Sequence, residues 1–212
     1  MTEVFIVGED PVTQEILRRL IKDYAPNLVV KNTLPARGSE IKSKMENFNK
    51  FSQSYPVILL SDLDTDDCAP LAKANLTKKM SEQNANFIIN IAVDEAEAWL
   101  FADREGFAKY LEISEDHMPT ASLQKFGGSK GRIEMDIPLK ASYFLTHNLI
   151  KESKNKDLLA QLLAEGKSCK GREYNSALLP YIRTKWNAEN ARKNSYSLDR
   201  TILRIQSLLA GR

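Results

Sequence analysis

The feature that most constrains the fold of this chain is the apolar run Val57–Leu60, which leads directly into an acidic turn. Branched apolar residues without polar alternation are typical of a strand buried on both faces, as in a parallel sheet covered by helices. The carboxyl end of such a strand lies at the edge where α/β proteins bind their ligands. The turn places four carboxylates at that edge, on Asp62, Asp64, Asp66 and Asp67.

Two of these carboxylates form an Asp-x-Asp motif. Asp62 and Asp64 are two residues apart, so on an extended chain their side chains point to the same side. Crowded carboxylates raise each other's pKa and need a neutralising partner, and their hard oxygen atoms suit Mg2+ or Mn2+. The alternative interpretation is a solvated acidic turn, because a lone Asp-x-Asp motif is short.

Apolar runs and amphipathic stretches alternate through the first half of the chain. The pattern predicts strands at 3–8, 28–30 (or to 32), 57–61 and 87–93, and helices at 12–24, 39–51, 70–80 and 98–111. Alternation at this spacing predicts right-handed crossovers. We therefore expect an α/β fold with a parallel four-stranded sheet flanked by helices.

Three of the four predicted strands end in acidic residues. Glu9 follows the first strand, Asp62 and Asp64 follow the third, and the segment Asp94–Glu97 follows the fourth. Parallel strands bring these ends to one edge of the sheet, where the carboxylates would repel one another. Because stability alone does not explain such an edge, the pattern favours a metal site.

Some roles at this edge stay open in the sequence. Glu95 and Glu97 are candidates for sharing the ion, and they face the same way only if the strand continues through them. If a helix has already begun, their directions diverge. For Glu9 or Asp10 the alternative is a helix-capping role, because a carboxylate at a helix N-terminus is favoured by the helix dipole.

The charge of the chain is unevenly distributed. Residues 1–110 hold 13 Lys or Arg and 17 Asp or Glu, a net charge of -4, whereas residues 111–212 hold 17 and 11, a net charge of +6. A basic region beside an acidic one could hold a phosphate backbone near a metal site. Ordinary solvated helix faces are the alternative interpretation.

Four basic residues are candidates for binding nucleic acid. Lys130 and Arg132 belong to a glycine-rich segment, 126–132, which could place backbone amides and two cations over a phosphate. Arg200 and Arg204 are spaced i, i+4 on the predicted last helix and could grip a phosphate. A flexible surface loop and solvated helix charges are the alternatives for the two pairs.

Length and composition set the remaining expectations. The 212 residues, 42% of them hydrophobic, fit an α/β domain at 1–110 and a basic, mostly helical region at 111–212. No apolar run approaches the roughly 20 residues of a membrane span, and the N-terminal apolar run is too short for a signal peptide. We expect a soluble cytoplasmic protein without a membrane partner. The oligomeric state is left open, a homo-oligomer included.

The acidic residues also resemble a known pattern. The TOPRIM domain, shared by topoisomerases, bacterial primases and OLD-family nucleases, has a Glu after its first strand and an Asp-x-Asp after its third. Glu9 and the Asp62–Asp64 motif match it, within about residues 1–110. The segment Asp94–Asp103 is similar to one found in uncharacterised bacterial TOPRIM-like families, some of them encoded beside ATPases in phage-defence modules. One departure is that Gly8 precedes Glu9, whereas the usual motif places Glu before Gly.

The resemblance implies a TOPRIM-like, Rossmann-type fold and a divalent-metal-dependent nuclease acting on DNA or RNA. Asp62 and Asp64 would hold Mg2+ or Mn2+, with Glu95 or Glu97 sharing it or placing a second ion. Glu9 would act as general base or acid, or as a further ligand.

Two other functions remain as alternatives. The first is a metal-binding, non-catalytic or regulatory subunit of a complex that contains an ATPase. The second is a small-molecule phosphatase, as the Asp-x-Asp motif of haloacid dehalogenase-type enzymes suggests. That motif follows the first strand in those enzymes, whereas here it follows the third predicted strand, so the phosphatase is disfavoured.

Overall fold

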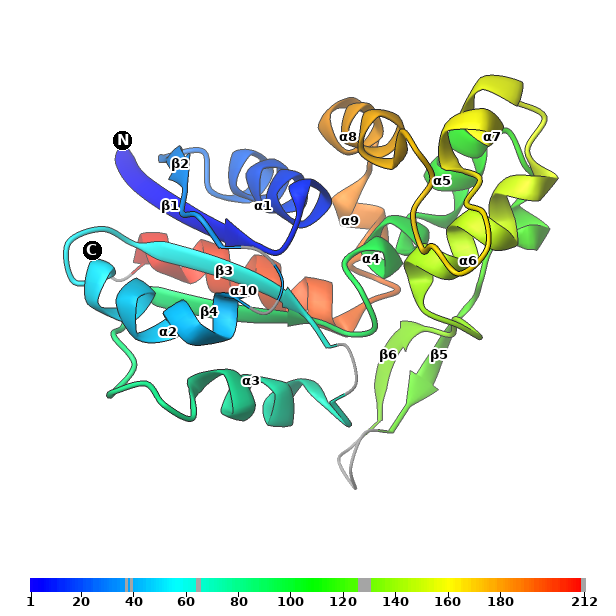
Figure 1. Cartoon of the computed structure of the whole chain (residues 1–212). Coiled ribbons are helices and arrows are strands. Elements are labelled where there is room, and N and C mark those ends of the chain that lie inside the picture. Colours follow the sequence, from blue (N-terminus) through cyan, green and yellow to red (C-terminus); the bar gives the residue numbers. More distant parts are fainter. Residues whose placement is uncertain (37, 39, 64–65, 126–130, 211–212) are drawn as a thin grey trace. The chain divides into compact units, whose positions relative to one another are not determined.

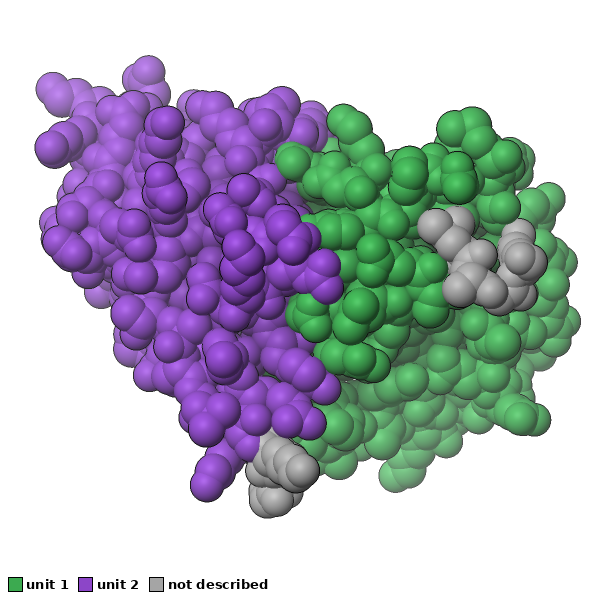
Figure 2. Space-filling view, turned by 180° about the vertical axis from the view of Figure 1, so that it is seen from behind, with its two compact units in different colours: residues 1–93, 199–212 green, residues 94–198 purple. Residues whose placement is uncertain are grey.

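The structure is a computed structural model, and it describes every residue except 37, 39, 64–65, 126–130 and 211–212. The chain divides into two compact units, coloured separately in Figure 2. Unit 1 comprises residues 1–93 and 199–212, and unit 2 comprises residues 94–198. These units change after Val93 and again within the last helix. The domain boundary expected at residue 110 stays a prediction.

Unit 1 contains a four-stranded sheet in the order β2-β1-β3-β4. The strands are β1 (Thr2–Gly8), β2 (Leu28–Thr33), β3 (Val57–Asp62) and β4 (Phe87–Ala92), and all neighbours pair in parallel. The predicted α/β class with a parallel sheet is confirmed. Because β2 and β3 lie on opposite sides of β1, the strand order reverses between β1 and β3, and α/β sheets bind ligands at such a switch point.

Helices cover both faces of this sheet (Figure 1). The helices α2 (Glu40–Phe51) and α3 (Ala69–Thr77) lie over one face, and α1 (Pro11–Tyr24) and α10 (Tyr196–Ala210) lie over the other. Under α2 the buried core includes Val57, Leu59 and Phe87. The intervening residues of β3 are also fully buried. Burial of both faces is the reason why this strand lacks polar alternation.

Unit 2 is mostly helical, which confirms the prediction for the second half of the chain. Its helices are α4 (Glu97–Ala102), α5 (Arg104–Leu111), α6 (Ala141–His147), α7 (Lys156–Leu162), α8 (Tyr174–Thr184) and α9 (Ala188–Ala191), with 3-10 turns at Glu115–His117 and Leu149–Glu152. The unit also holds an antiparallel hairpin of β5 (Ala121–Gln124) and β6 (Arg132–Met135), which the sequence analysis missed. Among the described residues, no helix is both long and apolar enough to cross a membrane.

The continuous helix predicted over 98–111 is wrong, because Asp103 separates α4 from α5. Asp103 is buried, and its carboxylate accepts hydrogen bonds from the Tyr181 hydroxyl at 3.0 Å and from the backbone amide of Asn187 at 2.9 Å. Gly106 permits the close packing of α5 on this carboxylate, since a Cβ atom there would lie 2.2 Å from Asp103 Oδ2. Partners this distant in sequence leave no signal in the local pattern.

Candidate active site at the ends of the parallel strands

The segment after β1 is set by the start of α1. Asp10 is the N-cap residue, and its carboxylate accepts a hydrogen bond from the Thr13 amide at 2.9 Å while the Thr13 hydroxyl accepts one from the Asp10 amide at 3.0 Å. Pro11 occupies the first helical position, which suits its fixed backbone angle. Asp10 therefore supplies the cap, and Glu9 is left for another role.

The side chain of Glu9 contacts β3, the strand next to β1. Gly8, the last residue of β1, pairs with Leu60 of β3, so Glu9 leaves β1 at the level of Ser61. Oε1 of Glu9 accepts a hydrogen bond from the Ser61 hydroxyl at 2.5 Å and one from the Asp62 amide at 3.1 Å. Glu9 and Asp62 are both half-buried. The structure thus brings together the predicted residues Glu9 and Asp62 at the switch point of the sheet.

The rest of the acidic turn is described in part. Asp64, the second residue of the Asp-x-Asp motif, lies outside the described residues. Asp66 accepts a hydrogen bond of 2.7 Å from the Asn75 side chain on α3, which indicates a structural role in the turn. Asp67 is exposed.

A divalent cation requires several oxygen ligands at one point. In the part of the chain that the structure describes, no three Asp, Glu, His or Cys side chains are grouped so that they could hold a metal ion. Mg2+, however, is commonly bound by one or two carboxylates together with water and substrate phosphates. Glu9 and Asp62 provide two carboxylates with hard oxygen atoms at one strand edge, and this chemistry fits Mg2+ or Mn2+.

The acidic segment after β4 belongs to unit 2, where it meets the start of α6. Asp94 Oδ2 accepts a hydrogen bond from the Ala141 amide at 3.1 Å, and Glu95 Oε2 accepts one from the Ser142 amide at 2.7 Å. Burial, and next the neighbouring Glu95, raise the pKa of Asp94 to about 7. Asp94 also adopts φ 64°, a left-handed conformation uncommon for residues other than glycine. These two carboxylates therefore cap α6.

Glu97 is the first residue of α4, so a helix has begun there and the strand does not continue through both glutamates. Its side chain is buried and accepts a hydrogen bond from the Tyr174 hydroxyl at 2.8 Å. The ammonium group of Lys170 lies 3.9 Å from the same oxygen. In unit 2, Glu95 and Glu97 thus have separate sets of partners, and both sets have a structural use.

The predicted nucleic-acid contacts differ in their surroundings. Lys130 lies outside the described residues. The Arg132 guanidinium lies over the Tyr196 ring at 4.7 Å from its centroid. Arg200 is exposed, whereas Arg204 is half-buried and donates a hydrogen bond of 3.4 Å to Asn90 on β4.

Lys73 on α3 is a basic residue that the sequence analysis missed. Burial, and next the charge of Arg204, lower its pKa. No local pattern indicates this pairing, because Lys73 and Arg204 come from helices more than a hundred residues apart.

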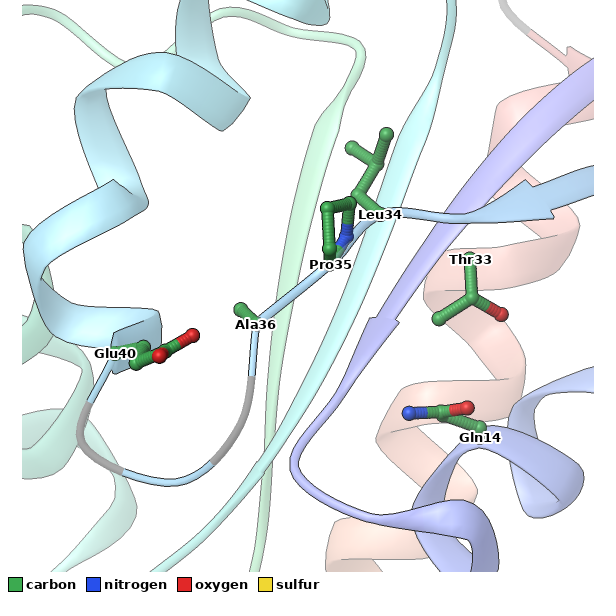
Figure 3. Close-up of a pocket in the computed structure, with 6 residues that line it drawn as sticks. All are labelled: Gln14, Thr33, Leu34, Pro35, Ala36 and Glu40. Carbon is green, nitrogen blue, oxygen red and sulfur yellow. The ribbon is translucent and has the colours of Figure 1, made fainter.

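A cavity of about 420 Å³ lies in unit 1 beside the end of β2 (Figure 3). It is lined by Gln14, Thr33, Leu34, Pro35, Ala36 and Glu40. Figure 3 shows the Gln14 amide and the Glu40 carboxylate on opposite sides of the loop that follows β2. Gln14 also donates a hydrogen bond of 3.1 Å to the carbonyl of Gly8, the residue before Glu9. No pattern in the sequence indicates this hollow.

Comparison with solved structures finds a similarity to the C-terminal region of the Burkholderia pseudomallei OLD protein. The sequence identity is 14% and the TM-score is 0.39, and the match covers 93% of this chain and 98% of that one. No curated protein matches the chain by sequence. The model of one protein family matches residues 8–129, which is more than half of the chain. The protein therefore belongs to the family described as Domain of unknown function (DUF4276).

Proposed function

We propose that the protein is a Mg2+- or Mn2+-dependent phosphodiester hydrolase that acts on DNA or RNA. The observation that carries the proposal is the hydrogen-bonded contact between Glu9 and the backbone of Asp62 at the switch point between β1 and β3. The arrangement of a Glu after the first strand and an Asp-x-Asp after the third is also the pattern that resembles TOPRIM nucleases. A phage-defence setting, which that resemblance implies, is part of the same proposal.

Glu9 is the proposed general base or acid. Among the described residues, every hydrogen bond to its carboxylate uses Oε1, with Ser61 and Asp62 as donors. The two donors hold the carboxylate in a fixed direction, which a proton-transferring group needs. In the proposed reaction, Oε2 takes a proton from the attacking water, whose oxygen forms a bond to phosphorus while the ester oxygen leaves.

Asp62 and Asp64 are the proposed metal ligands. When bound, the ion polarises the phosphate and stabilises charge on the leaving oxygen. Glu95 and Glu97 stay proposed further ligands on the strength of the sequence alone. To bind an ion they would have to exchange their present donors, the Ser142 amide and the Tyr174 hydroxyl.

Basic residues would hold the phosphate backbone of the substrate. The proposed contacts are Lys130, Arg132, Arg200 and Arg204, and we add Lys73, whose pKa is lowered by burial and by the charge of Arg204. Contacts of this kind weaken as the salt concentration rises and carry no sequence information.

A second candidate function is a metal-binding subunit without turnover, which would regulate or assemble a complex with an ATPase. The observation that favours it is that Glu9 acts as a brace between β1 and β3, a role that needs no chemistry. The caps that Asp94 and Glu95 provide for α6 are likewise structural roles that need no chemistry.

The test is cleavage of supercoiled plasmid and of total RNA by the purified protein in Mg2+, Mn2+ or EDTA. The variants are Asp62→Asn/Asp64→Asn and, as a control from the same turn, the exposed Asp67→Asn. We expect cutting that needs the metal, is abolished in the double variant and persists in the control. No cutting with either metal would overturn the stand-alone hydrolase, and co-purification with an ATPase would then support the second candidate.

A further inference from the structure

The hairpin of β5 and β6 buries a charged side chain and exposes two apolar ones. In its register Ser122 stands opposite Glu134, and Leu123 stands opposite Ile133. Glu134 is only 3% exposed, whereas Leu123 is 66% and Ile133 48% exposed. Antiparallel strands with one solvated face normally place apolar side chains inward and polar ones outward. The outer part of this hairpin has the opposite arrangement.

Contacts within unit 2 fix the orientation of the hairpin. The Glu134 carboxylate accepts hydrogen bonds from the Ser195 hydroxyl at 2.7 Å, the Ser197 amide at 2.6 Å and the Ser197 hydroxyl at 3.1 Å. On the same face Arg132 lies over the Tyr196 ring. Figure 1 shows the hairpin extending away from the helices of its own unit. The exposed apolar pair is thus held outward by polar bonds on the opposite face.

The charge around this pair is positive. Lys125 and Arg132 are exposed and lie within two residues of Leu123 and Ile133 in the sequence, with Arg132 on the face that carries Glu134. The described residues 123–125 and 131–133 contain two basic residues and no acidic one. The hairpin of a second copy is a poor partner, because it would bring the same cations face to face. The complementary partner is an anion with apolar surface between its charges.

We propose that this hairpin binds duplex DNA, with Leu123 and Ile133 in the major groove, Lys125 on one flanking phosphate and Arg132, from the opposite face of the hairpin, on the other. The inference rests on the proposed function and names its substrate class. The major groove of B-form DNA admits a two-stranded ribbon, and apolar side chains contact thymine methyl groups there.

Other nucleic acids fit the hairpin less well. Single strands are bound mainly on stacked aromatic side chains, whereas the exposed apolar pair of the hairpin, Leu123 and Ile133, is aliphatic. The major groove of duplex RNA is too narrow to admit side chains. Duplex DNA is therefore the substrate class that best matches the shape of the hairpin, its aliphatic pair and its cations.

The first experiment measures binding without cleavage. Fluorescence anisotropy in EDTA compares duplex DNA with duplex RNA and single-stranded DNA of the same sequence. We expect Leu123→Ser/Ile133→Ser to weaken duplex DNA binding about tenfold, the loss that corresponds to one well-buried apolar contact. Leu163→Ser, at an apolar side chain 37% exposed elsewhere in unit 2, should bind like the unaltered protein.

Salt dependence tests the cations. Lys125→Gln and Arg132→Gln should each lower the slope of log affinity against log salt by about 1, as expected for the loss of one phosphate contact. Lys109→Gln, which removes an exposed charge on α5, should leave the slope unchanged. Unchanged DNA binding in the hairpin variants would overturn the proposal. Tighter binding to anionic vesicles than to DNA, or a dimer that the apolar substitutions dissolve, would overturn it as well.

Cleavage assays separate this inference from the proposed function. If the protein cuts DNA and the hairpin variants bind like the unaltered protein, the hairpin inference fails and the hydrolase stands. If binding depends on the hairpin but no metal supports cutting, the hydrolase fails and the hairpin inference stands.

Discussion

The backbone amide of Asp62 donates a hydrogen bond of 3.1 Å to Oε1 of Glu9, which joins the end of β3 to the residue after β1. The Ser61 hydroxyl donates to the same oxygen. One carboxylate is therefore held over the switch point by two donors from the neighbouring strand. The contact makes Glu9 a structural brace and a candidate proton acceptor at once, and two substitutions separate these roles.

Glu9→Gln should abolish the chemistry and spare the fold. The amide oxygen of Gln can still accept from Ser61 and Asp62, but it cannot take a proton, so we expect cleavage to fall about 100-fold or more. Ser61→Ala removes one of the two donors, so it should lower the free energy of unfolding by about 1–2 kcal/mol through loss of a bond to a charged group and reduce cleavage less than Glu9→Gln does. Urea unfolding and plasmid cleavage measured on both variants check this. A Glu9→Gln protein that cuts normally would exclude Glu9 as the base.

Metal binding should appear in thermal unfolding even if turnover is slow. At 100 times the dissociation constant, an ion that binds only the folded state adds about 2.7 kcal/mol, which raises the Tm by several °C. Asp62→Asn/Asp64→Asn should lose this rise with Mg2+ and Mn2+. The Asp67→Asn protein should keep it. An equal rise in the double variant would place the ion elsewhere.

Gly106→Ala should destabilise the protein, although alanine normally favours a helix by about 1 kcal/mol over glycine. The added Cβ atom would lie 2.2 Å from Asp103 Oδ2, and the bonds to Tyr181 and Asn187 hold that carboxylate in place. We expect a loss of about 2–3 kcal/mol in the free energy of unfolding. In an Asp103→Ala background the same substitution should cost nothing, and a double-mutant cycle measures the difference.

Glu134 should make the stability of the protein fall with rising pH. Burial raises the pKa of Glu134 from 4.5 to about 7 in the folded protein. Between these two pH values the unfolded chain has released the proton and the folded chain retains it, so folding becomes less favourable as the pH rises. The stability is fully present below about pH 4.5 and is lost as the pH passes about 7. The loss is on the order of 3 kcal/mol.

The matched variant for this effect is Glu134→Gln, which has no titrating group. Urea unfolding at pH 5, 6, 7 and 8 should show the unaltered protein losing stability relative to the variant over this range. An exposed control, Glu173→Gln, should follow the unaltered protein. Parallel pH curves for Glu134→Gln and the unaltered protein would contradict the raised pKa.

The local pattern of the sequence was sufficient for the α/β part of the fold. Continuous apolar runs such as Val57–Leu60 and helical apolar spacing depend on neighbours in the chain, and the four predicted parallel strands are confirmed. The placement of Glu9 and Asp62 at one edge follows from parallel pairing, since each follows a strand that runs in the same direction.

The tertiary structure determined those features that depend on contacts between residues distant in sequence. Only the fold shows that Asp10, and not Glu9, caps α1, that Asp103 interrupts a helix, and that Glu95 and Glu97 have separate partners in unit 2. The hairpin was missed because its strands have four residues each and bury a glutamate whose partners, Ser195 and Ser197, lie about 60 residues away. A carboxyl group is stabilised by hydrogen-bond donors that packing brings close to it, and the neighbouring residues in the sequence do not predict which donors these are.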